Sequence, residues 1–153
     1  MGNETAVRLW EAFSTNHPSV PERCDGVWKL GDSEDYTKWS NVLVLSGLKT
    51  VYSYPVEAMC SEGISCPEVN DHYVLLDSTG VAVAVIQILD GQICPFDEVS
   101  ESFAYKAGEE DRSLETWREN HKPFFKRVLE RNELEFSTKM DILCVEFEVV
   151  FAA

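Results

Sequence analysis

The sequence predicts a single α+β domain, in which a small mixed or barrel-like sheet is flanked by helices. The chain has 153 residues, of which 44% are hydrophobic and 11% aromatic. That is enough for one proper core and too little for two. The expected elements run in the order helix, helix, several strands, helices, strand. This order lacks the regular alternation of strands and helices that a parallel sheet requires.

The first helix is expected from Glu4 to Asn16, because apolar residues recur there at helical spacing and an acidic residue lies near its start. Pro18 and Pro21 end the pattern, since proline removes a backbone donor and breaks a helix. We predict that residues 1–27 form a helix-and-loop extension and that residues 28–153 form the main part of the single domain.

A helix followed directly by a strand is expected around Lys49. The apolar residues that fit one face of this helix are Trp39, Val42, Leu43 and Leu45. Asp32 or Ser33 is placed to cap its start, and Asp32 has a second interpretation as a polar wall of a cleft. Gly47 is the expected helix end, because glycine alone enters the left-handed conformation cheaply. Residues 50–54 are β-branched or aromatic and predict a strand, so Lys49 is held between two rigid elements and can face a cleft.

Two strands are expected in the middle of the chain. Residues 73–76 and 81–89 are β-rich, and the turn at 77–80 between them predicts a hairpin. The second run is apolar at almost every position, which predicts a central, buried strand. The preceding residues, 56–71, are rich in turn formers and are interpreted mostly as loop.

The C-terminal half predicts helices and a last strand. A short helix is expected from about Phe96 to a stop at Gly108, and a long helix from Ser113 to about Arg131. The acidic cluster between them either stabilises the start of the long helix or forms part of a chemical site. Residues 141–151 alternate polar and apolar residues, which predicts a half-exposed terminal strand.

Composition limits the function classes. With 27 acidic against 13 basic residues the formal charge is −14, which argues against tight non-specific binding to nucleic acid. The five cysteines form no C-x-x-C pair and the three histidines are scattered, so we expect no metal and no cofactor. No apolar run approaches the roughly 20 residues of a membrane helix. We expect a cytoplasmic protein without membrane contact; its oligomeric state is not indicated.

Several separate segments together resemble the ASCH-domain family. They are residues 28–33, 44–50, 95–99, 108–114, Trp117-Arg118, Phe124-Phe125 and 144–150. The resemblance runs from Trp28 to Phe151 in the expected order. It implies a PUA-like fold, which is a small β-barrel with flanking helices, and a cleft near the helix-to-strand junction with a G-x-K-x-x-T motif on one wall. The family is associated with RNA-related roles, and a small bacterial subgroup hydrolyses the acetyl amide of N4-acetylcytidine.

The motif carries over only in part. Gly47 and Lys49 match its first two positions, but its threonine position falls on Tyr52. A phenol does not simply replace an aliphatic hydroxyl as a nucleophile. On a regular strand Ser53 shares a face with Lys49 and Thr50 does not, which makes Ser53 the better substitute.

The resemblance also implies an acidic partner for Lys49. Glu109 and Glu110 are the two candidates, and the sequence does not separate them. A desolvated lysine can act as a base, whereas a lysine beside a carboxylate acts as an electrostatic clamp. The alternative without chemistry is that Lys49 caps helix carbonyls and pairs with a surface glutamate.

Two hypotheses of function follow. In the first, the domain binds an RNA fragment or a nucleotide-like small molecule, with Lys49 on a phosphate and aromatic rings stacked on a base. The further residues assigned to this ligand are Trp28, Asp32, Tyr52, Tyr54, Arg112 and Arg118. In the second, the protein is a small amidohydrolase or ribonuclease that uses Lys49 with Glu109 or Glu110. Because of Tyr52, the second hypothesis ranks below the first for N4-acetylcytidine.

Overall fold

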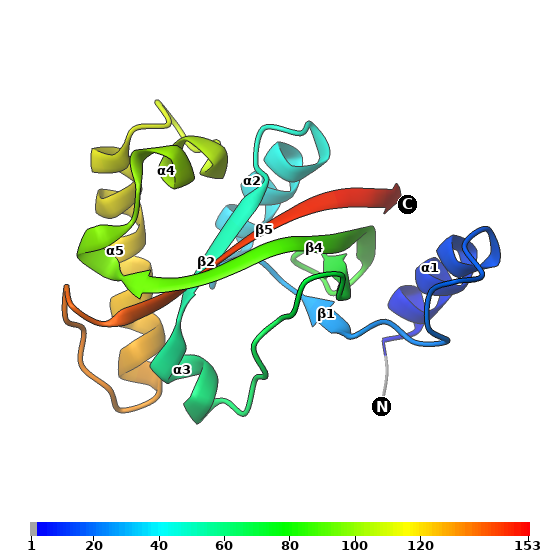
Figure 1. Ribbon diagram of the computed structural model, residues 1–153, viewed down its shortest axis with the longest axis horizontal. Helices are drawn as coiled ribbons and strands as arrows, with labels where there is room; N and C mark the ends of the chain where they lie inside the picture. Colours follow the sequence, from blue (N-terminus) through cyan, green and yellow to red (C-terminus); the bar gives the residue numbers. More distant parts are fainter. Residues whose placement is uncertain (1–2) are drawn as a thin grey trace.

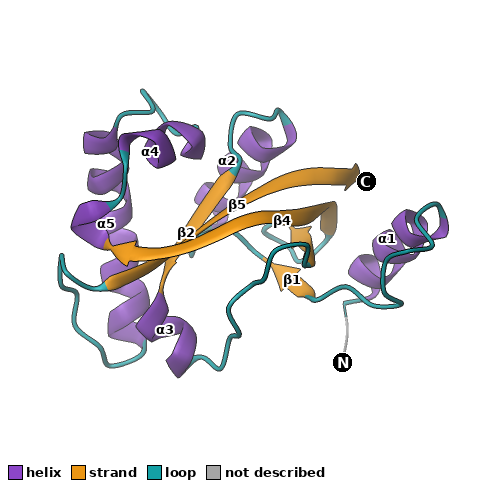
Figure 2. Cartoon of the chain, in the orientation of Figure 1, coloured by secondary structure: helices purple, strands orange, loops and turns teal. Residues whose placement is uncertain are grey.

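The computed structural model describes residues 3–153. In it, five strands form one mixed sheet that is curled into a half-barrel, and helices pack around this sheet (Figures 1 and 2). The predicted α+β class is therefore confirmed. The helices and strands follow in the order α1 (Glu4–Thr15), β1 (Gly26–Trp28), α2 (Glu34–Leu45), β2 (Val51–Pro55), α3 (Val56–Ser61), β3 (His72–Leu76), β4 (Ala82–Pro95), the 3-10 helix η1 (Phe96–Glu98), α4 (Glu101–Ala107), α5 (Leu114–Arg131) and β5 (Asp141–Ala152).

The strand order across the sheet is β1-β3-β4-β5-β2. β1 pairs with β3 in parallel, and the other neighbours are antiparallel. The expected hairpin joins β3 and β4, and β4 continues to Pro95 in pairing with β5. β4 and β5 form the long, curved centre of the sheet in Figure 1. β2 pairs with β5 at one edge and so brings the residues after Lys49 against the C-terminal strand.

β5 differs from the half-exposed strand that its alternating pattern predicts. The strand lies between β4 and β2, and residues 142–145 are buried on both faces. Ile142 packs in a core cluster with residues of α5, whereas Leu143 packs in a cluster with Met59 of α3. The expectation of one exposed face was wrong here because helices cover both sides of this part of the sheet.

The interpretation of residues 56–71 as loop was wrong at its start, where α3 lies. Pro55 precedes the first turn of this helix, and its restricted φ suits such a position. Ala58 and Met59 are buried, one in the cluster with α5 and the other under β5. A six-residue helix has too few residues for a periodic pattern, which explains why turn formers dominated the prediction.

Helix α2 buries polar residues and exposes apolar ones. Ser33, one of the two residues predicted to cap this helix, accepts a hydrogen bond from the Tyr36 N–H at 3.2 Å. The buried positions are Thr37, Ser40, Asn41 and Val44, whereas Trp39, Val42 and Leu45 are exposed. Both sets have helical spacing. Two of the three inward polar side chains donate to backbone carbonyls, Thr37 to Leu30 and Asn41 to Leu76, which compensates for their burial.

Helix α1 packs on the sheet at the end away from α4 and α5 (Figure 1). Leu9, Trp10 and Phe13 share a buried cluster with Val74 of β3 and Val85 of β4. The division of the chain at residue 27 stays a prediction. Over residues 3–153, none of the helices combines the length and the apolar character that crossing a membrane would take.

Candidate functional site

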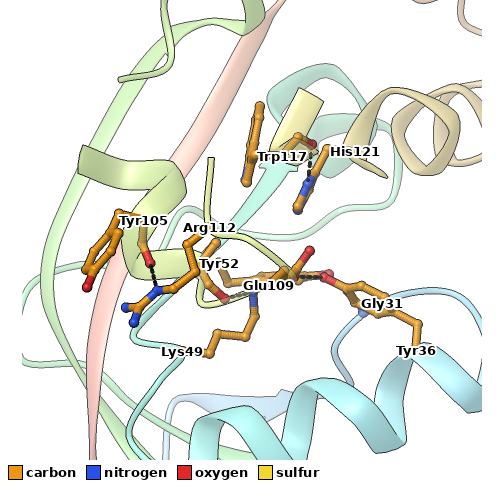
Figure 3. Close-up of polar contacts among 10 residues, drawn as sticks. Gly31, Tyr36, Lys49, Tyr52, Tyr105, Glu109, Arg112, Trp117 and His121 are labelled. Carbon is orange, nitrogen blue, oxygen red and sulfur yellow. Dashed lines mark hydrogen bonds and ion pairs between the residues drawn. The ribbon is translucent and has the colours of Figure 1, made fainter. Parts of the chain in front are cut away.

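Lys49 lies in the short connection between α2 and β2, and its side chain is buried. Gly47 has φ +85° and ends the helix, after which the Lys49 N–H bonds to the Leu43 carbonyl at 3.1 Å. The Lys49 side chain is 1% exposed. Its Nζ lies 2.9 Å from Oε2 of Glu109 and donates to the Ala107 carbonyl at 3.3 Å (Figure 3). The lysine is therefore fixed by an ion pair inside the protein.

Glu109 comes from the turn after α4, which touches the backbone beside Lys49. Gly108 has φ +69°, and a Cβ at Gly108 would lie only 2.4 Å from the Leu48 carbonyl oxygen. The two backbone segments can approach this closely because Gly108 has no side chain. Glu109 is 3% exposed, whereas Glu110 is exposed with φ +50°. Of the two acidic candidates, the structure brings Glu109 to Lys49.

Tyr36 of α2 is a third member of this site, and sequence reasoning missed it. Its hydroxyl donates to Glu109 Oε2 at 2.6 Å (Figure 3). Its ring occupies the space beside Gly31, where a Cβ would lie 2.1 Å from the ring. Gly31 has φ +80°, so a glycine is favoured there for its backbone as well. Nothing in the residues around Tyr36 distinguishes it from an ordinary first-turn residue of a helix.

His121 of α5 is buried near the ion pair. Because the Trp117 carbonyl can only accept, His121 Nδ1 carries the proton and donates to it at 2.9 Å (Figure 3). Nε2 is then the acceptor of the neutral ring. Burial lowers the pKa of His121 to about 4, so the imidazole is uncharged at neutral pH. No role was predicted for His121 from the sequence.

The electrostatics keep Glu109 ionised. Burial alone raises the pKa of the Glu109 carboxyl, but the charge of Lys49 and the hydrogen bonds from Tyr36 and Lys49 hold that pKa below its ordinary value. Burial and the neighbouring Glu109 raise the pKa of Tyr36 well above its usual range. Oε2 accepts both hydrogen bonds, whereas Oε1 is buried without a partner among residues 3–153.

A pocket of about 460 Å³ lies beside β2, next to this site. Four aromatic residues are among those that line it, namely Trp28, Tyr52, Tyr54 and Tyr73. The Tyr52 hydroxyl accepts a hydrogen bond from the Gly31 N–H at 3.2 Å. Gly31 lines the pocket too, and the ring of Tyr36 occupies the space that a side chain at Gly31 would need. Lys49 and Glu109 do not line the pocket.

Of the predicted ligand residues, Trp28, Tyr52 and Tyr54 lie together in the pocket wall, and Asp32, Arg112 and Arg118 lie elsewhere. Asp32 accepts two hydrogen bonds from Arg127, at 2.7 and 3.0 Å. The guanidinium of Arg112 stacks on Tyr105 at 3.7 Å from the ring centroid, and Arg112 Nε donates to the Tyr105 carbonyl (Figure 3).

Two further predicted residues have different surroundings from those expected. Arg118 donates from Nη2 to the Asp97 carbonyl at 3.1 Å. Ser53 lines the pocket but is 2% exposed, and its Oγ has no hydrogen-bond partner within the described part of the chain. The described residues include no group of three or more histidine, cysteine, aspartate or glutamate side chains arranged to hold a metal ion.

The fold and the buried lysine–glutamate pair define a small α+β domain of the PUA-like type. A family model described as the ASCH domain matches residues 26–151. The chain therefore belongs to the ASCH-domain family, as the sequence resemblance predicted. A search of curated proteins found no match.

Solved structures agree with this assignment. The chain is 26% identical to the ASCH domain from Lactobacillus crispatus, with a TM-score of 0.86, and the match covers 97% of this chain and 95% of that one. It is 30% identical to protein EF3133 from Enterococcus faecalis, with a TM-score of 0.87 over 97% of this chain and 90% of that one. The hypothetical protein PH0355 shares the fold at 16% identity, with a TM-score of 0.51 over 80% and 98% of the two chains.

Proposed function

We propose that this ASCH-domain protein binds a nucleotide-like small molecule or a short RNA fragment in the pocket beside β2. The observation that supports this most is the concentration of aromatic rings there, from β1, β2 and β3. A volume of about 460 Å³ lies within the range of small-molecule sites, roughly 300–1,000 Å³. Proteins bind unpaired bases by stacking them on aromatic side chains.

The charges around the pocket suit a short ligand. Lys29, Asp25 and Arg131 line it, and Arg131 is paired with Glu62 at 2.6 Å, in a chain of net charge −14, so the pocket has no surplus of positive charge for a long chain of phosphates. A long duplex would meet the acidic remainder of the surface, and its phosphates would be repelled. A nucleoside, a nucleotide or a few unpaired nucleotides avoids that cost.

In this proposal Lys49 and Glu109 support the pocket from behind. The Lys49–Glu109 pair holds the Tyr36 hydroxyl at 2.6 Å, and the Tyr36 ring packs against Gly31. Gly31 in turn donates to Tyr52 in the pocket wall. The ion pair thus fixes the wall that a ligand would contact, and it acts as an electrostatic clamp.

The proposal can be tested with tryptophan variants. Titration of the protein with nucleosides, nucleoside monophosphates and short single-stranded RNAs is expected to shift the amide signals of β1 and β2 in nuclear magnetic resonance spectra. Trp28→Ala is expected to weaken binding by about tenfold, because stacking on one base contributes about 1–3 kcal/mol. Trp39→Ala is the matched control, since Trp39 is exposed on α2 and does not line the pocket. Signals that stay unchanged at millimolar ligand would refute the proposal.

A second candidate function is a small hydrolase, either an amidohydrolase acting on N4-acylated cytidine or a ribonuclease. The unpartnered Oε1 of Glu109 favours it, because an ionised oxygen with a free acceptor site can bind and orient a water molecule. Lys49 beside it would stabilise negative charge on the attacked group. Turnover of N4-acetylcytidine and of RNA by the wild type would establish this function, and equal turnover by Lys49→Met would remove Lys49 from the mechanism.

A further inference from the structure

The three tyrosines of the pocket differ in how their hydroxyl groups are bonded. Tyr54 donates to Glu62 Oε1 at 2.8 Å and accepts from Arg131 Nη2 at 2.8 Å, so both of its roles are filled. Tyr73 donates to Asp71 Oδ2 at 3.3 Å. Neither hydroxyl has a proton to offer to a ligand.

Tyr52 is the exception among these three. Its hydroxyl accepts from the Gly31 N–H, and no acceptor for its own proton exists within residues 3–153. A phenol hydroxyl carries one proton to donate. Burial, with smaller effects of Asp32 and Glu109, raises the pKa of Tyr52 well above its ordinary value, so the proton stays on the oxygen. Tyr52 lines the pocket and is the one of these three tyrosines whose hydroxyl proton has no partner within residues 3–153.

The surroundings of this donor indicate which acceptor it suits. Tyr54 lies two residues along the same strand, in the wall of the same pocket, and the acidic side chains of Asp32 and Glu109 act on the Tyr52 hydroxyl through their charge. Lys49 and Arg127 are already paired with these carboxylates, so neither cation is free to bind a phosphate or carboxylate oxygen at this point. An uncharged oxygen in the plane of a stacked ring meets the requirements of both the donor and the aromatic walls.

We infer that Tyr52 selects ligands that carry a carbonyl oxygen on the base, by donating its hydroxyl proton to that oxygen. The inference rests on the proposed function, because it names the ligand class of the same pocket. It adds that a base lacking the carbonyl binds less well, although the stacking surface is equal. Tyr52 then acts as a specificity residue at the position where the family motif has threonine.

The test compares nucleosides that differ by a single ring carbonyl. Inosine is paired with purine riboside, and uridine with 4-deoxyuridine, in titrations followed by nuclear magnetic resonance. The wild type is expected to prefer the carbonyl-bearing member of at least one pair by about three- to tenfold, the usual effect of one neutral hydrogen bond. Tyr52→Phe is expected to abolish that preference. Tyr54→Phe, whose hydroxyl is already committed to protein partners, is expected to retain it.

The outcomes separate the inference from the proposed function. If no nucleoside binds the wild type, the proposed function fails and the inference fails with it. If nucleosides bind but the two members of each pair bind equally, only the inference is overturned. Retention of the preference in Tyr52→Phe also overturns it. The wild-type comparison does not depend on any variant, and thermal unfolding of both phenylalanine variants checks that each is folded.

Discussion

Replacing Lys49 with methionine removes one charge from a buried pair and leaves the other in place. The methionine keeps most of the volume of the lysine stem, so the core stays filled. Glu109 loses its cation but keeps the hydrogen bond from Tyr36. The two charged side chains are 1% and 2% exposed, so water cannot replace the missing ammonium. The variant therefore holds an uncompensated carboxylate.

Removing one partner of a buried pair typically costs about 3–5 kcal/mol of stability. Protonation of Glu109 limits this loss. Holding a carboxyl of ordinary pKa 4.5 in its neutral form at pH 7 costs about 3.4 kcal/mol, at about 1.36 kcal/mol for each unit of pH. We therefore expect Lys49→Met to lower the free energy of unfolding by about 3–4 kcal/mol at pH 7, and by only about 1 kcal/mol at pH 5.

The sign of the pH dependence follows from linkage. In the wild type the Glu109 pKa is lowered by folding, so its contribution is present above the unfolded pKa and is lost as pH falls. In Lys49→Met burial is no longer opposed by the lysine, and the folded pKa rises above the unfolded one. In the variant, the contribution of Glu109 to stability is then present at low pH and is lost as the pH rises. Between pH 5 and pH 7 Glu109 should therefore add little pH dependence to the stability of the wild type, whereas the variant should lose stability as the pH rises.

Urea unfolding at pH 5 and pH 7 measures both effects. Lys106→Met is the matched control, because Lys106 forms an ion pair with Glu146 at 3.2 Å with side chains that are 44% and 33% exposed. Exposed pairs contribute about 0–1 kcal/mol, so this control should change stability little at either pH. If Lys49→Met is no less stable than Lys106→Met, or loses the same amount at both pH values, the assignment of a buried charged pair is wrong.

Three further predictions concern residues around the pair. Gly108→Ala should lower the free energy of unfolding by at least about 2 kcal/mol, because alanine would be strained at positive φ and would clash with the backbone of Leu48. Gly47→Ala is the control for strain alone, since Gly47 also has positive φ, +85°, but has open space around it. If thermal unfolding shows that the two variants lose equal stability, the close approach of Gly108 to the Leu48 carbonyl is contradicted. Tyr36→Phe should cost about 2 kcal/mol and raise the pKa of Glu109, which a carboxyl titration followed by nuclear magnetic resonance would measure. His121 should begin to protonate in the folded protein only near pH 4, so stability should fall as pH drops from 6.5 towards 4; an imidazole signal that titrates at 6.5 would refute this.

Local signals predicted most elements of the fold. Glycines with positive φ at Gly47 and Gly108 end α2 and α4, and Ser33 and Ser113 cap α2 and α5. These predictions succeeded because a cap or a left-handed residue depends on its own backbone and a few neighbours. The order of such signals also carried the family resemblance, which the match over residues 26–151 confirms.

The residues of α2 alone do not determine which face of this helix lies inward. Its apolar set and its small polar set have equivalent spacing, so periodicity alone favours the apolar one. The choice is made by the carbonyls of Leu30 and Leu76, which Thr37 and Asn41 satisfy. Burial of β5 on both faces likewise follows from which helices cover the sheet. These are tertiary facts, and a single sequence does not encode them in any local pattern.

The candidate site was predictable in its residues more than in its arrangement. Lys49 followed from the junction and the motif, but the choice of Glu109 over Glu110 required the backbone contact at Gly108. Tyr36 had no local signal, since it is a tyrosine near the start of an ordinary helix. The expectation of a single cleft combined two places that the structure separates, namely a buried ion pair and an aromatic pocket.

The partners of the ion pair are 60 residues apart in the chain, which has a consequence for the order of folding. A growing polypeptide that ends before residue 109 has no carboxylate for Lys49, so the lysine must stay hydrated and the contact between Leu48 and Gly108 cannot form. The last turn before α5 therefore has to be made before β2 can settle beside β5 with its lysine covered. Because β2 also needs its partner β5, chains truncated upstream of Asp141 should be recognised by proteases as unfolded.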